Sequence, residues 1–190
     1  MLKYEAGFSV LKFDGKSRNC SKGLYFEDVK SLLSAGMNPC DYAYTSEVIN
    51  KLKRLLSEEI CEFEWGGGER TWFLSEPELT LVTDNFGWHE NVEVPTSQIL
   101  ELMELRKHLM DNWSKDEVTS LIRDSFEKII KDKSKYIDDE EASRYKIFHS
   151  ESGFIVLMVL LEEDFEVTPI EYCRQLKFND NFFPPENLLT

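Results

Sequence analysis

The sequence predicts an α+β fold, a single domain over residues 1–190 in which an antiparallel β-meander or sheet packs against several helices. Segments with the 3.6-residue period of amphipathic helices are interspersed with short runs in which apolar and polar residues alternate. The central runs follow one another with turn residues between them. The chain has no internal repeat, low-complexity stretch or linker, and its 190 residues are enough to bury a core.

The first third of the chain predicts a strand followed by two helices. Residues 4–13 alternate loosely and end at a turn, as expected for a strand. Residues 24–35 place their apolar side chains on one stripe and predict a short helix, with Gly36 positioned to cap it. Residues 45–60 keep the helical period more strongly and predict a second helix that starts at residue 45 or 46.

The centre of the chain predicts four short strands joined by turns. Their positions are residues 61–65, 71–74, 79–83 and 88–94. The glycines at 66–68 join the first two strands as a hairpin turn, and Pro95 ends the last strand. In that last strand we expect Trp88 to share a face with Val92 and Val94.

The second half predicts two longer helices, a hairpin and a short helix. A helix over residues 96–113 is followed at once by Ser114-Lys115-Asp116-Glu117, which matches a capping box and starts the next helix. Residues 145–148 and 154–161 predict a β-hairpin. Its second strand is apolar on both faces and is expected to be central in a sheet or covered on both sides. Thr168-Pro169-Ile170-Glu171 is a second capping box and starts the short helix.

The sequence predicts a cytoplasmic protein. Residues 1–7 show neither the apolar core nor the cleavage pattern of a signal peptide. The longest apolar run, residues 154–161, has eight residues, whereas a membrane-spanning helix needs about 20. The four cysteines form no CxxC pair, and without an export signal we expect them to be reduced.

The net charge is the unusual property of the composition. The chain has 22 Lys and Arg against 36 Asp and Glu, a formal net charge of −14 at pH 7. Residues 61–113 carry 3 basic and 11 acidic side chains and residues 138–190 carry 4 and 12, so each segment has a net charge of −8. This balance disfavours nucleic acid as a partner, because binding it requires cations that replace the counterions of the phosphates. It also disfavours anionic membranes. Three explanations of the negative charge remain: a basic protein partner, a bound cation, or simple solubility.

The sequence contains no recognised catalytic or cofactor-binding motif, so we expect no cofactor and no enzymatic activity. His149-Ser150-Glu151 matches half of a zinc deaminase motif, but the downstream Pro-Cys-x-x-Cys half is missing. Residues 138–141 lack the alternating ligands and central glycine of an EF-hand, and residues 162–164 are expected to form a solvated exit from a strand. Catalytic carboxylates can be scattered along a chain. An enzyme of unrecognised type, with or without a metal ion, is therefore the alternative.

Five aromatic residues cluster in the predicted meander and are interleaved with acidic residues. They are Trp65, Trp72, Phe73, Phe86 and Trp88. One interpretation is a sheet with one buried face and one wet, acidic face. The other is that some of these rings are exposed as anchors of a protein interface inside a charged rim.

The predicted meander contains the sequence Trp72-Phe73-Leu74-Ser75-Glu76-Pro77-Glu78-Leu79-Thr80-Leu81-Val82-Thr83-Asp84, which continues through Gly87-Trp88 and Glu93-Val94-Pro95 into a helix. This stretch resembles the small bacterial immunity proteins, cytosolic inhibitors that are encoded beside polymorphic or contact-dependent growth-inhibition toxins. Those proteins are diverse in fold, so the resemblance transfers no functional residue. It implies a role without enzymatic activity, in which the protein covers a toxin domain, often a nuclease with a basic active-site surface. The charge points independently to the same class of partner.

We therefore predict an acidic, cytoplasmic, protein-binding inhibitor, an immunity protein that neutralises a cognate bacterial toxin by covering its basic active-site surface. The predicted partner is a basic protein, a toxin domain, and neither a nucleic acid nor a membrane. The residues predicted to bind it are carboxylates of the two acidic segments: Glu62, Glu64, Glu90, Glu93, Asp138, Asp139, Glu140, Glu162, Glu163 and Asp164. A structural subunit or adaptor is a further alternative, and it would show a large exposed apolar patch.

Overall fold

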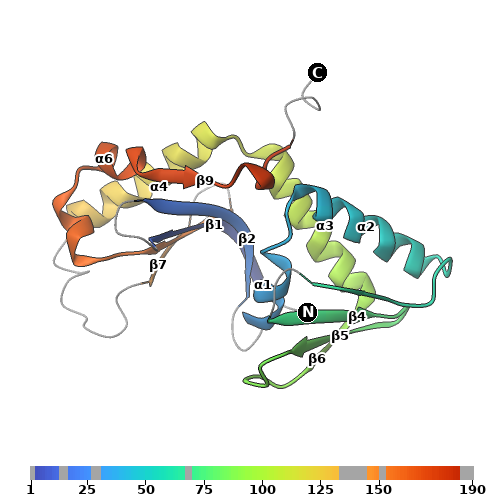
Figure 1. Ribbon diagram of the computed structural model, residues 1–190. Helices are drawn as coiled ribbons and strands as arrows, with labels where there is room; N and C mark the ends of the chain where they lie inside the picture. The colour runs from blue at the N-terminus through green and yellow to red at the C-terminus, as the bar shows by residue number, and fades with distance from the viewer. Residues whose placement is uncertain are drawn as a thin grey trace. The chain divides into compact units, whose positions relative to one another are not determined.

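The predicted α+β class is confirmed. The computed structural model describes residues 3–12, 17–26, 31–66, 70–132, 145–149 and 153–184. These residues form five α-helices and two β-sheets (Figure 1). None of the described helices is long and apolar enough to cross a membrane.

The chain divides into two compact units, and each is described by itself. The first unit comprises residues 1–6, 23–112 and 181–190, and the second comprises residues 7–22 and 113–180. The behaviour of residues 1–190 as a single domain stays a prediction.

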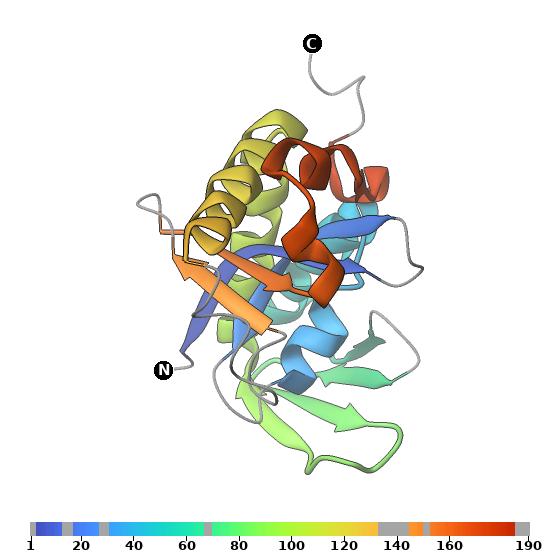
Figure 2. The same cartoon turned by 90° about the vertical axis from the view of Figure 1, so that its left-hand side faces the viewer.

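One sheet has five strands in the order β7-β8-β1-β2-β9. Its strands are β1 (Tyr4–Lys12), β2 (Arg18–Phe26), β7 (Tyr145–His149), β8 (Ile155–Val159) and β9 (Leu176–Phe178). Strand β8 pairs antiparallel with β7 and parallel with β1 (Figure 2). The prediction that the apolar strand of the second hairpin is central in a sheet is therefore confirmed. Strand β9, which pairs parallel with β2, was not predicted.

The predicted helix over residues 24–35 is wrong in its first part. Residues 24–26 are the end of strand β2, and helix α1 (Ser31–Met37) starts later. The side chain of Asn38 explains how this strand end is held. Its Oδ1 accepts a hydrogen bond from the Leu24 amide, and its Nδ2 donates one to the Leu24 carbonyl, both at 2.8 Å. The backbone of Leu24 is thus satisfied without helical hydrogen bonds.

The other sheet is the predicted antiparallel meander. Its strands are β3 (Phe63–Trp65), β4 (Thr71–Ser75), β5 (Leu79–Asp84) and β6 (Val92–Pro95), and they pair in sequence order. The last strand begins at Val92 and not at residue 88, so the expected alternation of Trp88 with Val92 and Val94 is wrong. Residue 88 lies instead in the turn region between β5 and β6.

Helices α1 and α3 (Thr96–Asn112) contact the four-stranded sheet in the first unit (Figure 1). Gly36 lies within α1 and does not cap it. A Cβ atom at this position would lie 2.1 Å from Cε2 of Phe73 on β4, so glycine is needed for the helix to approach the sheet this closely. Helix and sheet therefore meet over the buried Phe73 ring.

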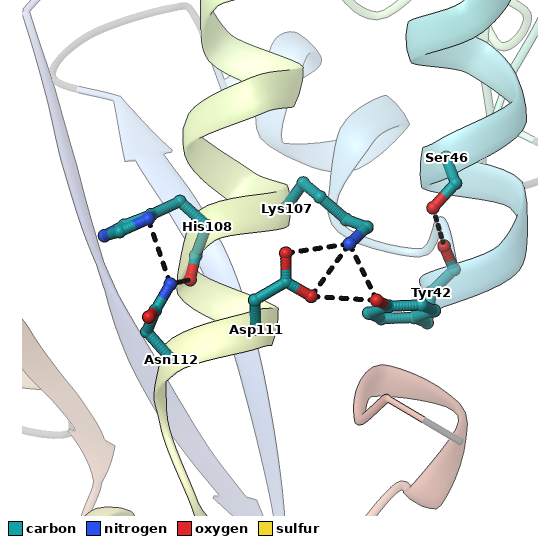
Figure 3. Close-up of polar contacts among 6 residues, drawn as sticks. All are labelled: Tyr42, Ser46, Lys107, His108, Asp111 and Asn112. Atoms are coloured by element: carbon teal, nitrogen blue, oxygen red, sulfur yellow. Dashed lines mark hydrogen bonds and ion pairs between the residues drawn. The ribbon is translucent and has the colours of Figure 1, made fainter. Parts of the chain in front are cut away.

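Helix α2 (Tyr42–Leu56) packs along α3 in the same unit. Polar contacts join the N-terminal end of α2 to the last turns of α3 (Figure 3). The Lys107 ammonium donates hydrogen bonds of 2.7 Å to the Tyr42 hydroxyl and 2.8 Å to each oxygen of Asp111. Burial lowers the pKa of Lys107, but the hydrogen bonds that its ammonium donates to Asp111 and Tyr42 outweigh this effect and raise that pKa above its ordinary value.

The second unit contains helices α4 (Lys115–Lys131) and α6 (Pro169–Arg174) and the 3-10 helix η2 (Glu162–Glu166). A further 3-10 helix, η3, spans Asp180–Phe182. Both predicted capping boxes are present, at Ser114 with Glu117 and at Thr168 with Glu171. The α4 and α6 helices contact one another.

Candidate protein-binding face

The four-stranded sheet has two different faces because side chains alternate along each strand. On the inner face, Trp65 stacks on Phe73 with ring centroids 4.0 Å apart, and both rings are buried. The Trp65 indole donates a 2.9 Å hydrogen bond to the Ser75 hydroxyl, which also accepts one of 3.0 Å from Thr80. The inner face is therefore a packed core in which the Trp65 indole and the hydroxyls of Ser75 and Thr80 are hydrogen-bonded to one another.

The opposite side, which we call the outer face, carries an apolar centre between two glutamates. Strand pairing sets Leu74 opposite Leu81, with Glu64 beside Leu74 on edge strand β3 and Glu93 beside Leu81 on edge strand β6. Opposed residues of neighbouring strands share a face, so these four side chains form one row across the sheet. Both glutamates are exposed and both leucines are half-buried.

Two larger apolar side chains extend this row. Trp72 lies two positions before Leu74 on β4 and is 46% exposed, and Leu79 lies two positions before Leu81 on β5 and is 43% exposed. Residues two apart on a strand point to the same side of the sheet. The outer face is thus an apolar surface with carboxylates at its edges. Protein interfaces commonly have an apolar core inside a polar rim.

The turn region after β5 adds an exposed aromatic pair to the same unit. Phe86 and Trp88 are 53% and 72% exposed, and their rings stack with centroids 5.2 Å apart. We call these two side chains the aromatic knob. Of the aromatic cluster, Trp65 and Phe73 are buried while Trp72, Phe86 and Trp88 are exposed. That the exposed rings are anchors of a protein interface stays a prediction.

A polar cluster of Asp84, His89 and Arg70 lies beside the aromatic knob. The buried Asp84 carboxylate at the end of β5 lies 3.0 Å from Nδ1 of His89 and 3.5 Å from Nη2 of Arg70. The Arg70 Nη2 also lies 2.9 Å from His89 Nδ1. Sequence reasoning missed this cluster because Arg70 precedes Thr71, which lies opposite Asp84 only when β4 and β5 pair.

The ionisation of Asp84 is set by its partners. Burial of its carboxylate disfavours the charged form, but the amide of Phe86, then His89 and Arg70, outweigh it and hold the pKa of Asp84 below its ordinary value. The carboxylate is therefore ionised and keeps the two basic side chains beside it.

The cations of residues 61–113 are engaged within the first unit. Arg70 pairs with Asp84, Lys107 pairs with Asp111, and the buried Arg106 donates 2.6 Å hydrogen bonds to the carbonyls of Asn38 and Cys40. Among these three, Arg70 alone lies beside the aromatic knob. The charge that the segment presents around the outer face is negative.

The predicted binding residues of this segment are all at the surface. Glu62 and Glu64 are exposed at strand β3, and Glu90 and Glu93 are exposed before and within strand β6. The structure thus brings Glu64 and Glu93 to the edges of one face.

The other predicted binding residues belong to the second unit or lie outside the described residues. Asp138, Asp139 and Glu140 lie outside the part of the chain that the structure describes. Glu162 and Glu163 are exposed on η2. The two acidic segments contribute to different sheets.

Asp164 is a correction to the prediction of a solvated segment at residues 162–164. Its carboxylate is buried and forms an ion pair with the buried guanidinium of Arg18. It also accepts a 2.9 Å hydrogen bond from the Leu161 amide, which starts η2. We therefore assign Asp164 a structural role and do not include it in the proposed surface.

Within the described residues, no group of three or more His, Cys, Asp or Glu side chains is placed to hold a metal ion. No protein-family model, curated protein or solved structure matches the chain.

Proposed function

We propose that this chain is an acidic protein-binding inhibitor, and that the outer face of its four-stranded sheet covers a basic surface of the partner. The observation that carries the proposal is the composition of that face. An apolar centre at Trp72, Leu74 and Leu81 lies between exposed glutamates on both edge strands. Apolar side chains supply the binding energy of such an interface, and charges at its rim supply orientation and speed of association.

The charge distinguishes this proposal from self-association and from a neutral adaptor. A second copy of the chain would bring the same glutamates against Glu64 and Glu93, and like charges at an interface oppose binding. An adaptor that binds a neutral partner needs the apolar centre but not the carboxylates at its edges. Lysine and arginine side chains on the partner would complement both the outer face and the net charge of −14.

The proposed partner is a bacterial toxin domain, and the chain would be its immunity protein. This step rests on the resemblance of residues 72–95 to immunity proteins together with the charge. A nuclease carries a basic surface for its phosphodiester substrate. Carboxylates that occupy this surface in place of phosphates would block the substrate without any chemistry by the inhibitor.

The test is affinity capture from the source cells at low ionic strength, run in parallel with the wild-type chain and two charge-reversed variants. The first variant carries Glu64→Lys and Glu93→Lys. The second, a control with the same net charge, carries Glu101→Lys and Glu104→Lys on the exposed surface of α3. We expect the wild-type chain and the control to retain one basic protein, identified by mass spectrometry, which a salt gradient releases.

The outer-face variant is expected to lose that protein while its circular dichroism spectrum stays unchanged. Co-expression of the wild-type chain should then abolish the toxicity of the captured protein in growing cells. Equal capture by both variants, or toxicity that the chain does not reduce, would contradict the proposed function.

A further inference from the structure

The turn region between β5 and β6 presents the aromatic knob in a fixed conformation. Oδ1 of Asp84 accepts a 3.0 Å hydrogen bond from the Phe86 amide, and the Asp84 carbonyl accepts one of 3.0 Å from the Gly87 amide. Gly87 has a φ of 66°, a left-handed conformation that glycine adopts at little cost. These contacts close the turn on both sides of Phe86.

The Trp88 ring is held from the side of the sheet. The guanidinium of Arg70 lies over the ring, with Cζ 5.2 Å from the ring centroid. Arg70 itself is fixed by Asp84 and His89. Phe86 also stacks on the Trp88 ring, with 27° between the ring planes. Two large rings are thus ordered by their neighbours although more than half of each is exposed.

This combination is unfavourable for the isolated protein and favourable for binding. Exposed aromatic surface costs free energy in water, in proportion to its apolar area. An anchor that is already ordered loses little conformational entropy when it binds. Tryptophan is also one of the residue types enriched at the hot spots of protein interfaces.

We infer that the aromatic knob, Phe86 and Trp88, is the anchor that enters an apolar pocket on the partner, and that the rim of this pocket carries lysine or arginine side chains. The inference rests on the proposed function and adds to it the contact that supplies most of the affinity. The basic rim follows from charge complementarity. Arg70, the cation beside Trp88, is paired with Asp84, and the exposed charges that follow the aromatic knob in the sequence are the carboxylates of Glu90 and Glu93.

The experiment uses the full chain and a phage-displayed library of cyclic peptides as the probe. Peptides are selected on the wild-type chain at low ionic strength, and their affinities are then measured for Trp88→Ser, Phe86→Ser and a matched control, Ile170→Ser. Ile170 is 60% exposed on α6, so its substitution removes a comparable exposed apolar side chain from the other unit. Circular dichroism and thermal unfolding verify that each variant folds.

We expect the selected peptides to combine an aromatic or aliphatic residue with lysine or arginine. Their affinity should fall at least about 30-fold in Trp88→Ser, the loss typical of an interface hot spot, and should be unchanged in Ile170→Ser. Selection of peptides without basic residues, or equal losses in Trp88→Ser and Ile170→Ser, would overturn the inference.

A third variant distinguishes the contribution of the aromatic knob to peptide binding from that of the outer face. Trp72→Ser removes the largest exposed side chain of the outer face and leaves the turn region intact. If Trp72→Ser abolishes peptide binding while Trp88→Ser has no effect, the inference fails and the proposed binding face stands. If neither substitution changes the affinity, both the inference and the proposed face fail.

Discussion

Single polar residues decide the local structure where strands end. Asp84 is the last residue of β5, and its carboxylate binds the amide of Phe86 and the side chains of Arg70 and His89. These contacts favour a turn over continuation of the ladder, which is why Trp88 lies outside the strand predicted for residues 88–94. Apolar and polar residues do alternate over residues 88–94, but the contacts of the buried Asp84 carboxylate with its three partners outweigh the preference of this pattern for a strand.

We predict that Asp84→Asn weakens the dependence of stability on acid pH. A carboxylate whose pKa is lower in the folded state stabilises the fold above its unfolded-state pKa, about 3.9 for aspartate. That stabilisation is lost as the pH falls through the lower, folded-state pKa. Asp84 has such a lowered pKa. The free energy of unfolding, measured by urea denaturation from neutral pH to about pH 3, should therefore fall less steeply in Asp84→Asn than in the wild type.

The variant should also be less stable than the wild type at neutral pH, because the amide cannot balance the charge of Arg70. Glu101→Gln on α3 is the control for removal of an exposed carboxylate. A pH dependence of Asp84→Asn that superimposes on that of the wild type would contradict the prediction. Glu117 and Glu171, whose pKa values are lowered by their hydrogen bonds in the capping boxes, act in the same direction in all three proteins.

Elements whose cause is local could be predicted from the sequence, and elements whose cause lies elsewhere in the chain could not. Both capping boxes depend on residues three positions apart, and the structure contains both. Strand β9 has three residues and exists because it pairs with β2, more than 150 residues earlier. The strand conformation of residues 24–26 also has a distant cause, since the side chain of Asn38 binds the backbone of Leu24.

The candidate site follows the same division. The sequence predicted that Glu64 and Glu93 would be exposed on the meander. The sequence alone could not place them at opposite edges of one face, because this depends on the register that sets Leu74 opposite Leu81. Asp164 was predicted as a solvated residue because its neighbours are acidic. Its burial depends on the distant Arg18.

Helix α1 offers a test of how the sheet is supported. We predict that Gly36→Ala lowers the free energy of unfolding by about 1–3 kcal/mol, the usual cost of overpacking a core. The new Cβ would lie 2.1 Å from Cε2 of Phe73 and 3.0 Å from Cγ2 of Thr71. The loss should occur although alanine is favoured over glycine in a helix by up to about 1 kcal/mol. Urea denaturation monitored by tryptophan fluorescence measures it.

The Phe73→Leu background is the control for this test. Leucine lacks the ring atoms that the new methyl group would strike, so Gly36→Ala should cost less in that background than in the wild type. An equal cost in both backgrounds, or a stabilising effect of Gly36→Ala in the wild type, would show that contact with Phe73 does not determine the effect.

At the scale of the whole molecule, the chain passes from one compact unit to the other within strands. The unit boundaries fall inside β1 and β2, because residues 4–6 and 23–26 belong to the first unit and residues 7–12 and 18–22 to the second. A strand ladder is cooperative, since loss of one part frees the hydrogen-bonding groups of the next. The chain can therefore unfold in one step although it has two compact units.

We predict that the two units unfold in a single transition. The tryptophans allow each unit to be followed separately, because Trp65, Trp72 and Trp88 lie in the first unit and Trp113 lies in the second. Substitution by 5-fluorotryptophan gives each of them its own ¹⁹F resonance. The resonances of both units should lose their native intensity at the same urea concentration, and the calorimetric enthalpy of thermal unfolding should equal the van't Hoff enthalpy. Separate midpoints for Trp113 and Trp65 would show instead that the shared strands do not couple the units. The outer face would then belong to a domain that can fold without residues 113–180.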